Sequence, residues 1–149
     1  MIQRKQSLFL IQILFLGLSL LFVPCQVIIT KAVATNVYLM PLTEFQSTIG
    51  HLFAVGINFI GLVITAITIF IFKKRELQVK LCYTLMVIWT VLMGMMILCP
   101  FVAKTEEIVE IKINYFVVAI GLFSVMAAYF AARFIKKDID LLKSADRIR

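Results

Sequence analysis

Residues 73–80 read KKRELQVK and lie between two apolar stretches of membrane length. Four of the fifteen basic residues of the chain fall within this short stretch. Short loops that connect membrane-spanning helices and are rich in lysine and arginine stay on the cytoplasmic side of the membrane. The stretch therefore predicts a cytoplasmic turn between two spans, and this turn assigns a side to every other loop.

The composition is typical of a membrane protein. Apolar residues make up 62% of the 149 positions, against about 45–50% in soluble domains. They are gathered into four long runs and do not recur with the short period of a soluble helix or strand. We therefore expect an all-α integral membrane protein with a single domain, residues 1–149, built as a four-transmembrane-helix bundle. The expected spans are roughly residues 7–25, 51–72, 81–101 and 114–135.

The first apolar run follows a basic start and resembles a secretory signal peptide. Its apolar core is longer than that of a usual signal, and residues 22–24 read Phe-Val-Pro, which is not a small-residue cleavage site. Pro24 stands directly before Cys25, where a lipoprotein signal needs a small residue. We interpret the run as an uncleaved first span whose N-terminus is cytoplasmic.

Three stretches outside the apolar runs favour β structure. Residues 27–30 and 37–40 are rich in β-favouring side chains, and residues 110–113 alternate charged and apolar side chains. They predict a small hairpin on the outer side, or a three-stranded sheet if the third stretch joins it. An irregular loop over residues 26–50 is the alternative.

The charges are distributed very unevenly between the two sides of the expected topology. Twelve of the fifteen basic residues fall inside, and only Lys31, Lys104 and Lys112 fall outside. This asymmetry predicts that both termini are cytoplasmic. The net charge of +7 does not indicate nucleic-acid binding, because the charges sit at the ends of the apolar runs and not along one face of a soluble helix.

The basic turn and the basic tail provide the candidate contact residues. They would meet anionic lipid headgroups or an acidic surface on a membrane-protein partner, and simple anchoring of the topology is the alternative for each of them. The tail, residues 136–149, carries an apolar stripe and is expected to continue as an amphipathic helix. The candidates are Lys73, Lys74, Arg75, Lys80, Lys136, Lys137, Arg147 and Arg149.

Small residues in the fourth span mark a surface for close helix packing. Gly121, Ser124, Ala128 and Ala132 recur at steps of three and four residues and so share one helix face. The neighbour that packs there is either another helix of this chain or another subunit of a homo-oligomer.

The sequence predicts no catalytic, cofactor-binding or metal-binding residues. Its one histidine, His51, has no cysteine or carboxylate at a metal-ligand spacing, and no Cys-x-x-Cys motif is present. Cys25 and Cys99 fall at the outer ends of the first and third spans. They would form a structural disulfide if these spans are neighbours, and two unpaired thiols are the alternative.

Several stretches resemble one protein family. They are residues 1–4 and 6–7 (MIQR and QS), 72–81 (FKKRELQVKL), 135–138 (IKKD) and 144–149 (SADRIR). Together they resemble the family called domain of unknown function 4293, although Lys5 stands where an apolar residue is expected. The resemblance implies four helices and a bacterial inner membrane, mainly in Bacteroidota. It implies no activity and no catalytic residues.

These observations lead to two main functional hypotheses, beside a third class, envelope thiol chemistry, in which Cys25 and Cys99 would cycle between states. In the first, the chain is a non-enzymatic inner-membrane protein that acts as an accessory or structural subunit of a membrane assembly. The second is a small transporter or channel that works as an oligomer, in which Gln12, Asn58 and Asn114 face a shared pathway.

Overall fold

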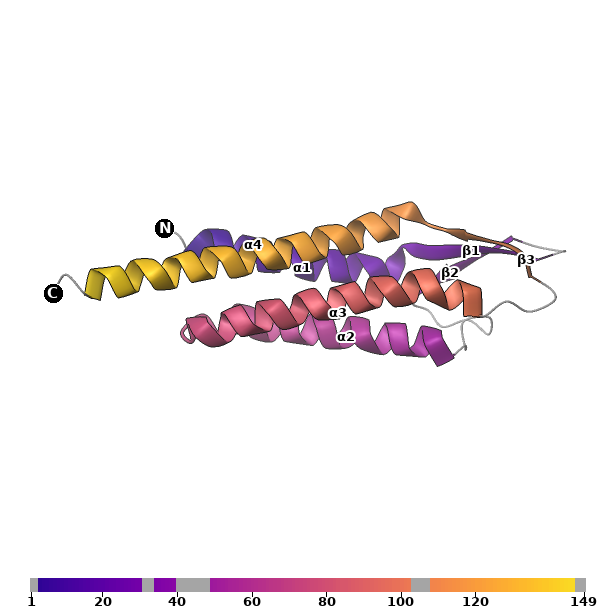
Figure 1. The fold of residues 1–149 in the computed structure, drawn as a ribbon. Coiled ribbons are helices and arrows are strands. Elements are labelled where there is room, and N and C mark those ends of the chain that lie inside the picture. Colours follow the sequence, from indigo (N-terminus) through magenta and orange to yellow (C-terminus); the bar gives the residue numbers. More distant parts are fainter. Residues whose placement is uncertain (1–2, 31–33, 40–48, 103–107, 147–149) are drawn as a thin grey trace.

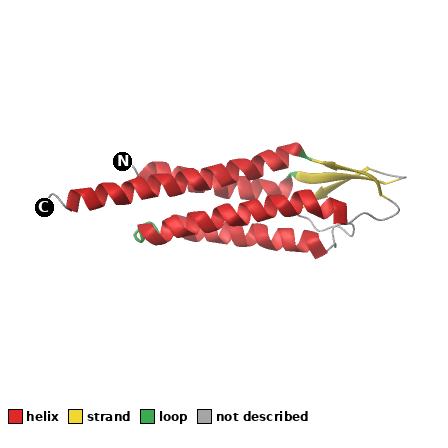
Figure 2. Cartoon of the chain, viewed as in Figure 1, coloured by secondary structure: helices red, strands yellow, loops and turns green. Residues whose placement is uncertain are grey.

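The computed structural model describes residues 3–30, 34–39, 49–102 and 108–146. This part of the chain is mostly helical and carries a small sheet at one end (Figures 1 and 2). The helices are α1 (Gln3–Phe22), α2 (Ile49–Phe70), α3 (Arg75–Val102) and α4 (Tyr115–Asp146). The strands are β1 (Pro24–Thr30), β2 (Ala34–Tyr38) and β3 (Ile108–Ile113). The expected helical fold with a three-stranded sheet is confirmed.

The four helices lie side by side along a common direction. Helix α1 contacts α2 and α4, and helix α3 contacts the same two helices. The start of α1, the α2–α3 turn and the end of α4 lie together at the end of the molecule opposite the sheet (Figure 1). We call this the basic end, because it holds the α2–α3 turn of residues 71–74 and the charged last turns of α4, and we call the other the sheet end.

The basic stretch is only partly a turn, which corrects the expectation for residues 73–80. The turn is confined to residues 71–74, and residues 75–80 form the first turns of α3. Glutamate, leucine, glutamine and lysine all favour helix, and Glu76 stands four residues before Lys80, a spacing that supports helix on an exposed face. Glu76 also lies at the positive end of the helix dipole. Charge alone therefore does not end a helix here.

The other helices also differ by a few residues from the expected spans. Helix α1 ends at Phe22, and β1 begins at Pro24. Proline disfavours helical backbone at the preceding residue, which places the boundary at Val23. At the other end of the chain, α4 continues without a break from Tyr115 to Asp146, so most of the basic tail is helical.

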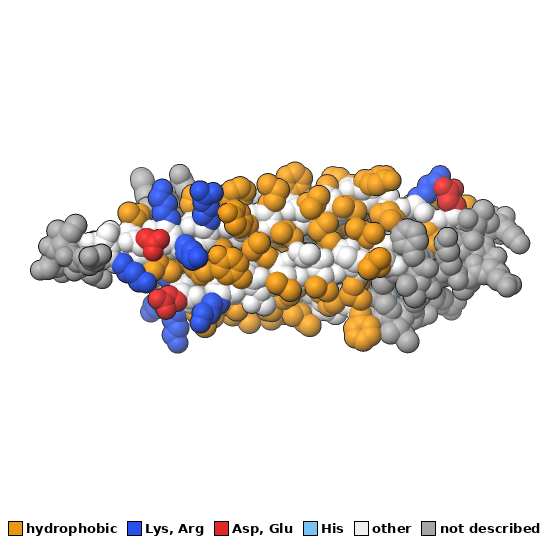
Figure 3. All heavy atoms as spheres, in the orientation of Figure 1, with side chains coloured by type: hydrophobic (Ala, Val, Ile, Leu, Met, Phe, Trp, Pro, Cys, Tyr) orange, Lys and Arg blue, Asp and Glu red, His pale blue; other side chains and the backbone are white. Residues whose placement is uncertain are grey.

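Three helical segments are long and apolar enough to cross a membrane. They are His51–Phe70, Arg75–Leu98 and Tyr115–Ser144. Helix α1 contributes a shorter apolar segment, Gln6–Phe22. Large apolar side chains such as Phe15, Ile60 and Phe123 are exposed on these helices. Figure 3 shows a broad apolar band between the two charged ends.

The interior of the helical body is organised around Trp89 of α3. Its side chain is fully buried, and its ring lies against Gly17 of α1 and Gly61 of α2. A Cβ atom on Gly17 would lie 2.6 Å from the Trp89 ring and 2.8 Å from Leu62, so only glycine leaves room there. The indole thus ties three helices together at one level.

Helices α1 and α4 also share an aromatic contact. The ring of Phe9 stacks on that of Phe134 with centroids 5.7 Å apart, and it lies 5.9 Å from Phe130. Aromatic pairs at this separation stabilise beyond the area they bury. The contact holds α1 against α4 near the basic end.

The sheet is antiparallel with the order β2-β1-β3. Gln26 pairs with both Val37 and Ile113, which places β1 in the middle. On β3, Glu110 and Lys112 are exposed while Ile111 and Ile113 are partly buried, as the charge alternation predicted. The Gln26 side-chain amide also donates to the Met96 carbonyl at 2.9 Å, which ties the sheet to α3.

Candidate functional site at the basic end

Charged side chains are concentrated at the basic end. Of the described lysine and arginine side chains, only Lys112 lies at the sheet end, where it faces Glu110 at 3.6 Å (Figure 3). Between the two ends the visible surface is a band of apolar side chains. The molecule therefore offers one extended basic surface.

The structure places the predicted contact residues in different environments. Lys73 and Lys74 are exposed in the α2–α3 turn, Lys80 is exposed on α3, and Lys136 and Lys137 are exposed on α4. We call these five the exposed lysines. Arg147 and Arg149 lie outside the described residues, so their contacts remain predictions.

Arg75 differs from the exposed lysines because it is engaged within the molecule. One of its guanidinium nitrogens lies 2.7 Å from a carboxylate oxygen of Asp138 on α4. The two side chains are 23% and 12% exposed, so the pair is largely shielded from water. An ion pair of this length joins the first residue of α3 to the last third of α4.

The local backbone explains the position of Arg75. The backbone amide of Gln78 donates to the carbonyl of Lys74 at 3.0 Å. Lys74 is therefore the N-cap residue of α3, and Arg75 is its first helical residue. Its side chain then leaves the helix beside the turn and reaches across to α4. Sequence reasoning missed the partner, Asp138, although Ile135 lies three residues before it on the buried face of α4.

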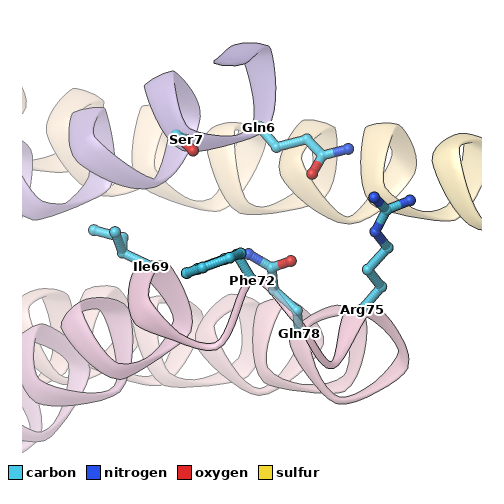
Figure 4. A pocket seen from close by; sticks show the side chains of 6 residues that line it. All are labelled: Gln6, Ser7, Ile69, Phe72, Arg75 and Gln78. Atoms are coloured by element: carbon cyan, nitrogen blue, oxygen red, sulfur yellow. The ribbon is translucent and has the colours of Figure 1, made fainter. Parts of the chain in front are cut away.

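A polar cavity of about 240 Å³ adjoins the ion pair. It is lined by Gln6 and Ser7 of α1, Ile69 of α2, Phe72 of the turn, and Arg75 and Gln78 of α3. Figure 4 shows the side chains of Gln6 and Arg75 extending toward each other from α1 and α3. The cavity is thus a gap between α1, α2 and α3 at the basic end, lined by both polar and apolar side chains.

Both glutamines of the cavity are buried. Each is 5% exposed, and the Gln78 amide nitrogen donates to the Thr68 carbonyl at 3.1 Å. The Gln6 amide nitrogen has no hydrogen-bond partner among the described residues. Burying an amide donor without a partner costs roughly 1–3 kcal/mol. The cavity therefore presents an unused donor next to a guanidinium.

The predicted packing face of α4 lies inside the molecule. Ser124, Ala128 and Ala132 are fully buried, and Gly121 is in direct contact with Met93 of α3. The Ser124 hydroxyl donates to the Ile120 carbonyl at 2.9 Å, so it is satisfied within its own helix. The neighbour across this face, at least at Gly121, is α3 of the same chain.

Of the two cysteines proposed to form a disulfide, the structure describes the side chain of Cys25. Cys25 is a buried free thiol that donates to the Val23 carbonyl at 3.7 Å, and burial raises its pKa to about 12. Cys25 is thus unpaired in the structure, whereas the side chain of Cys99 lies outside the described residues. Within the part of the chain that the structure describes, no three histidine, cysteine or acidic side chains are grouped so as to hold a metal ion.

The three polar residues proposed to line a pathway are separated by the fold. Gln12 is exposed on α1. Asn114 precedes α4, where its side-chain oxygen Oδ1 accepts from the Phe116 backbone amide at 3.0 Å and its side-chain nitrogen donates to the Pro24 carbonyl at 2.8 Å. Asn114 is thus a helix cap that also anchors the sheet. Only Asn58 lies in the interior, where it is fully buried.

The sequence profile of one family, described as Domain of unknown function (DUF4293), matches residues 2–148. The chain belongs to this family. The matched region covers every described helix and strand of this DUF4293 protein, including the cavity and the ion pair. No curated protein and no solved structure matches the chain.

Proposed function

We propose that the chain is a four-span protein of a bacterial inner membrane that acts as an accessory or structural subunit of a membrane assembly. In this proposal it is not an enzyme, and it binds a membrane-protein partner through the exposed lysines of its basic end. The observation that carries the proposal is the separation of charged ends from an apolar middle in Figure 3.

The apolar middle supports a membrane location. Soluble monomers rarely expose contiguous apolar patches of more than a few hundred Å². Here aromatic and aliphatic side chains such as Phe15, Ile60 and Phe123 are 55–67% exposed along the length of the helices. In a bilayer these side chains would face lipid and not water, so their exposure would carry no free-energy penalty.

Helix α1 is proposed as the fourth span. Its apolar segment, Gln6–Phe22, is about 26 Å long at 1.5 Å per residue, close to the roughly 30 Å hydrocarbon core of a bilayer. It runs beside α2 and α4, which both contain candidate spans. Slight thinning of the bilayer or the flanking basic residues would accommodate the difference.

The proposed orientation puts the basic end in the cytoplasm. The exposed lysines then lie where anionic headgroups and acidic surfaces of cytoplasmic or membrane partners are available. Lysine carries a compact, strongly hydrated charge on a flexible stem, which suits an exposed contact better than an internal one. Arg75 is not one of these exposed contacts, because its guanidinium is paired with Asp138 within the molecule.

The partner proposal is tested by purification from native membranes in a mild detergent. The wild-type protein is expected to retain one membrane protein at a constant ratio. Replacing Lys73, Lys74, Lys136 and Lys137 by glutamine should remove this partner, whereas Lys112→Gln at the sheet end should not. Retention of the same partner by the quadruple variant, or recovery of the chain alone from wild-type membranes, would contradict the proposal.

A second candidate function is favoured by Asn58. Among the described residues, neither amide atom of this fully buried side chain has a hydrogen-bond partner. Thr65 and Thr68, also fully buried, lie on the same face of α2, seven and then three residues further toward the basic end. In an oligomeric transporter or channel this polar stripe would line a hydrated path that ends at the cavity.

Thiol accessibility separates the two functions. Asn58→Cys and Thr65→Cys are made in a protein whose own cysteines are replaced by serine. A water-borne methanethiosulfonate reagent should label both positions if the stripe is hydrated. Val63→Cys, an exposed position on the opposite, lipid-facing side of the same helix in this proposal, is the control. Equal and slow labelling of all three positions would count against transport.

A further inference from the structure

The cavity at the basic end has the chemistry of an anion site. Its lining includes a guanidinium, two carboxamides and a hydroxyl, from Arg75, Gln6, Gln78 and Ser7 (Figure 4). Asp138 lies beyond the lining and contacts Arg75 through one oxygen. A guanidinium has five N–H donors, so a single ion pair leaves donors for another acceptor.

The start of α3 adds to the positive potential of the cavity. Arg75 is the first residue of this helix, where the backbone amides have no partner within the helix, and Gln78 is the first residue whose amide has one, the Lys74 carbonyl. The partial positive charge at a helix N-terminus favours an anionic group. The positive end of the α3 dipole and the Arg75 guanidinium therefore both make the electrostatic potential in the cavity more positive.

The buried amide of Gln6 is the observation that points to a ligand. Gln6 is 5% exposed, extends into the cavity, and its nitrogen has no partner within the described part of the chain. Buried polar groups in folded proteins are nearly always hydrogen-bonded, so a missing partner needs an explanation. An acceptor oxygen bound between Gln6 and Arg75 provides it.

The size and position of the cavity narrow the choice of anion. The volume of the cavity is about 240 Å³. A single water molecule needs roughly 10–15 Å³ of cavity volume, so the cavity holds a group of several atoms. The cavity lies at the basic end, and its lining includes the apolar side chains of Ile69 and Phe72. Basic pockets between membrane helices at this level receive the headgroups of lipids.

We propose that the cavity between Gln6, Arg75 and Gln78 binds a phosphate group, with the phosphodiester of an anionic membrane phospholipid as its source. The phosphate oxygens accept hydrogen bonds from the Arg75 guanidinium and the Gln6 amide. The glycerol part of the lipid lies against Phe72 and Ile69. This site is independent of the exposed lysines and of any protein partner.

Calorimetric titration of the purified full-length chain in an uncharged maltoside detergent tests the site. The titrants are dihexanoylphosphatidylglycerol, inorganic phosphate, and dihexanoylglycerol, which has no phosphate. Saturable binding of the phospholipid with at least tenfold weaker binding of inorganic phosphate is expected. Comparable binding of both phosphate compounds would keep the phosphate site and assign it to a soluble phosphorylated ligand. Equal binding of dihexanoylglycerol and the phospholipid would overturn the proposal.

Three variants make the test specific to the cavity. Gln6→Met keeps the side-chain volume and the Arg75–Asp138 pair but removes the amide, and it should weaken phospholipid binding at least fivefold. Gln6→Glu places a carboxylate in the cavity and should abolish binding. Lys74→Gln removes an exposed charge next to the cavity and should change the dissociation constant less than twofold.

The outcome of these variants is decisive even if one of them folds poorly. Each is first compared with wild type by its thermal unfolding midpoint, and Gln6→Glu serves if Gln6→Met is unstable. If both Gln6 variants bind as tightly as wild type, or if Lys74→Gln loses binding as strongly as they do, general charge attraction explains the binding and the site is refuted. Because the titration uses the chain alone, it does not depend on the partner proposal.

Discussion

Arg75 and Asp138 join α3 to α4 at the basic end through an ion pair 2.7 Å long. The residues are sixty-three positions apart in the chain, and both lie outside the expected spans 81–101 and 114–135. The pair fixes the direction in which Arg75 leaves the α2–α3 turn. It thereby also shapes one wall of the cavity.

Removing one member of this pair should destabilise the fold. Breaking a fully buried pair costs about 3–5 kcal/mol because a charge remains without its partner. Arg75 and Asp138 are 23% and 12% exposed, so we expect a smaller loss, about 1–3 kcal/mol, for Asp138→Ala. Thermal unfolding in detergent, followed by the fluorescence of the single tryptophan, measures the change.

A double-mutant cycle separates the pair from its surroundings. Arg75→Gln and Asp138→Asn together leave no buried charge, so the double variant should be more stable than the sum of the single losses predicts. Asp140→Ala, an exposed carboxylate on the same helix, is the control and should change the midpoint little. Additive losses in the cycle would show that the two side chains do not interact.

The contact between Gly17 and Trp89 predicts a steric effect. A methyl group at Gly17 would lie 2.6 Å from the indole ring, and the fully buried ring cannot easily move away. Overpacking of this kind costs about 1–3 kcal/mol, so Gly17→Ala should lower the unfolding midpoint by several degrees. The same thermal unfolding assay measures it.

Gly56 provides a matched control for this substitution. A Cβ atom at Gly56 meets nothing within 4 Å, so Gly56→Ala should leave the midpoint unchanged or raise it slightly. Both glycines are in apolar helices, and they differ in the space around them. A similar loss in both variants would mean that helix flexibility, and not contact with Trp89, determines the effect.

The helices and the sheet could be predicted from the sequence because their signals are local. Long apolar runs identify helices that cross a membrane, and the alternation at Glu110, Ile111 and Lys112 identifies a strand with one wet face. The strand order β2-β1-β3 could not be read in this way. Periodicity shows which face of β3 is exposed, but it does not show which edge of the hairpin β3 joins.

The polar contacts of the candidate site could be predicted only in part. The basic character of the α2–α3 turn and of α4 is evident from composition, whereas the pairing of Arg75 with Asp138 depends on how α3 and α4 are rotated. A usable signal existed: Ala128, Ala131 and Ile135 continue at helical spacing to Asp138, which places a carboxylate on a buried face. A buried carboxylate requires a cation nearby.

Asn114 shows how the same residue type serves different purposes. Its position before an apolar run suggested a pathway residue, but its side chain caps α4 and binds the Pro24 carbonyl. Asn58 has neither contact among the described residues and is fully buried. Sequence alone could not distinguish them, because a cap is recognised by the direction of its side chain.

The buried thiol of Cys25 should react slowly. With its pKa raised to about 12, roughly one part in ten thousand is thiolate at pH 8, against about one tenth at the ordinary pKa of 9.0. A protein in which Cys82 and Cys99 are replaced by serine should therefore react with N-ethylmaleimide about a thousandfold more slowly when folded than when unfolded in dodecyl sulfate. The rate should rise about tenfold per pH unit.

The same pKa shift predicts a dependence of stability on pH. Because the folded state favours the neutral thiol, its contribution to stability is fully present below pH 9 and is lost as the pH rises toward 12. The Cys25→Ala variant should lack this loss. Labelling of the folded protein at pH 8 as fast as that of the unfolded protein would show that the thiol is accessible and that its pKa is not raised.

Reporter fusions test the proposed orientation. Green fluorescent protein fused after Arg149 should fluoresce, because it matures in the cytoplasm, and alkaline phosphatase inserted at residues 103–107 should be active, because it needs the oxidising outer side. The physical reason is the excess of lysine and arginine at the basic end, which resists transfer across the membrane. Replacing Lys73, Lys74, Lys136 and Lys137 by glutamate should lower both signals, whereas Lys112→Glu at the sheet end should not. An inactive phosphatase at residues 103–107, together with no fluorescence from the fusion after Arg149, would reverse the orientation and place the exposed lysines and the phosphate cavity on the outer side.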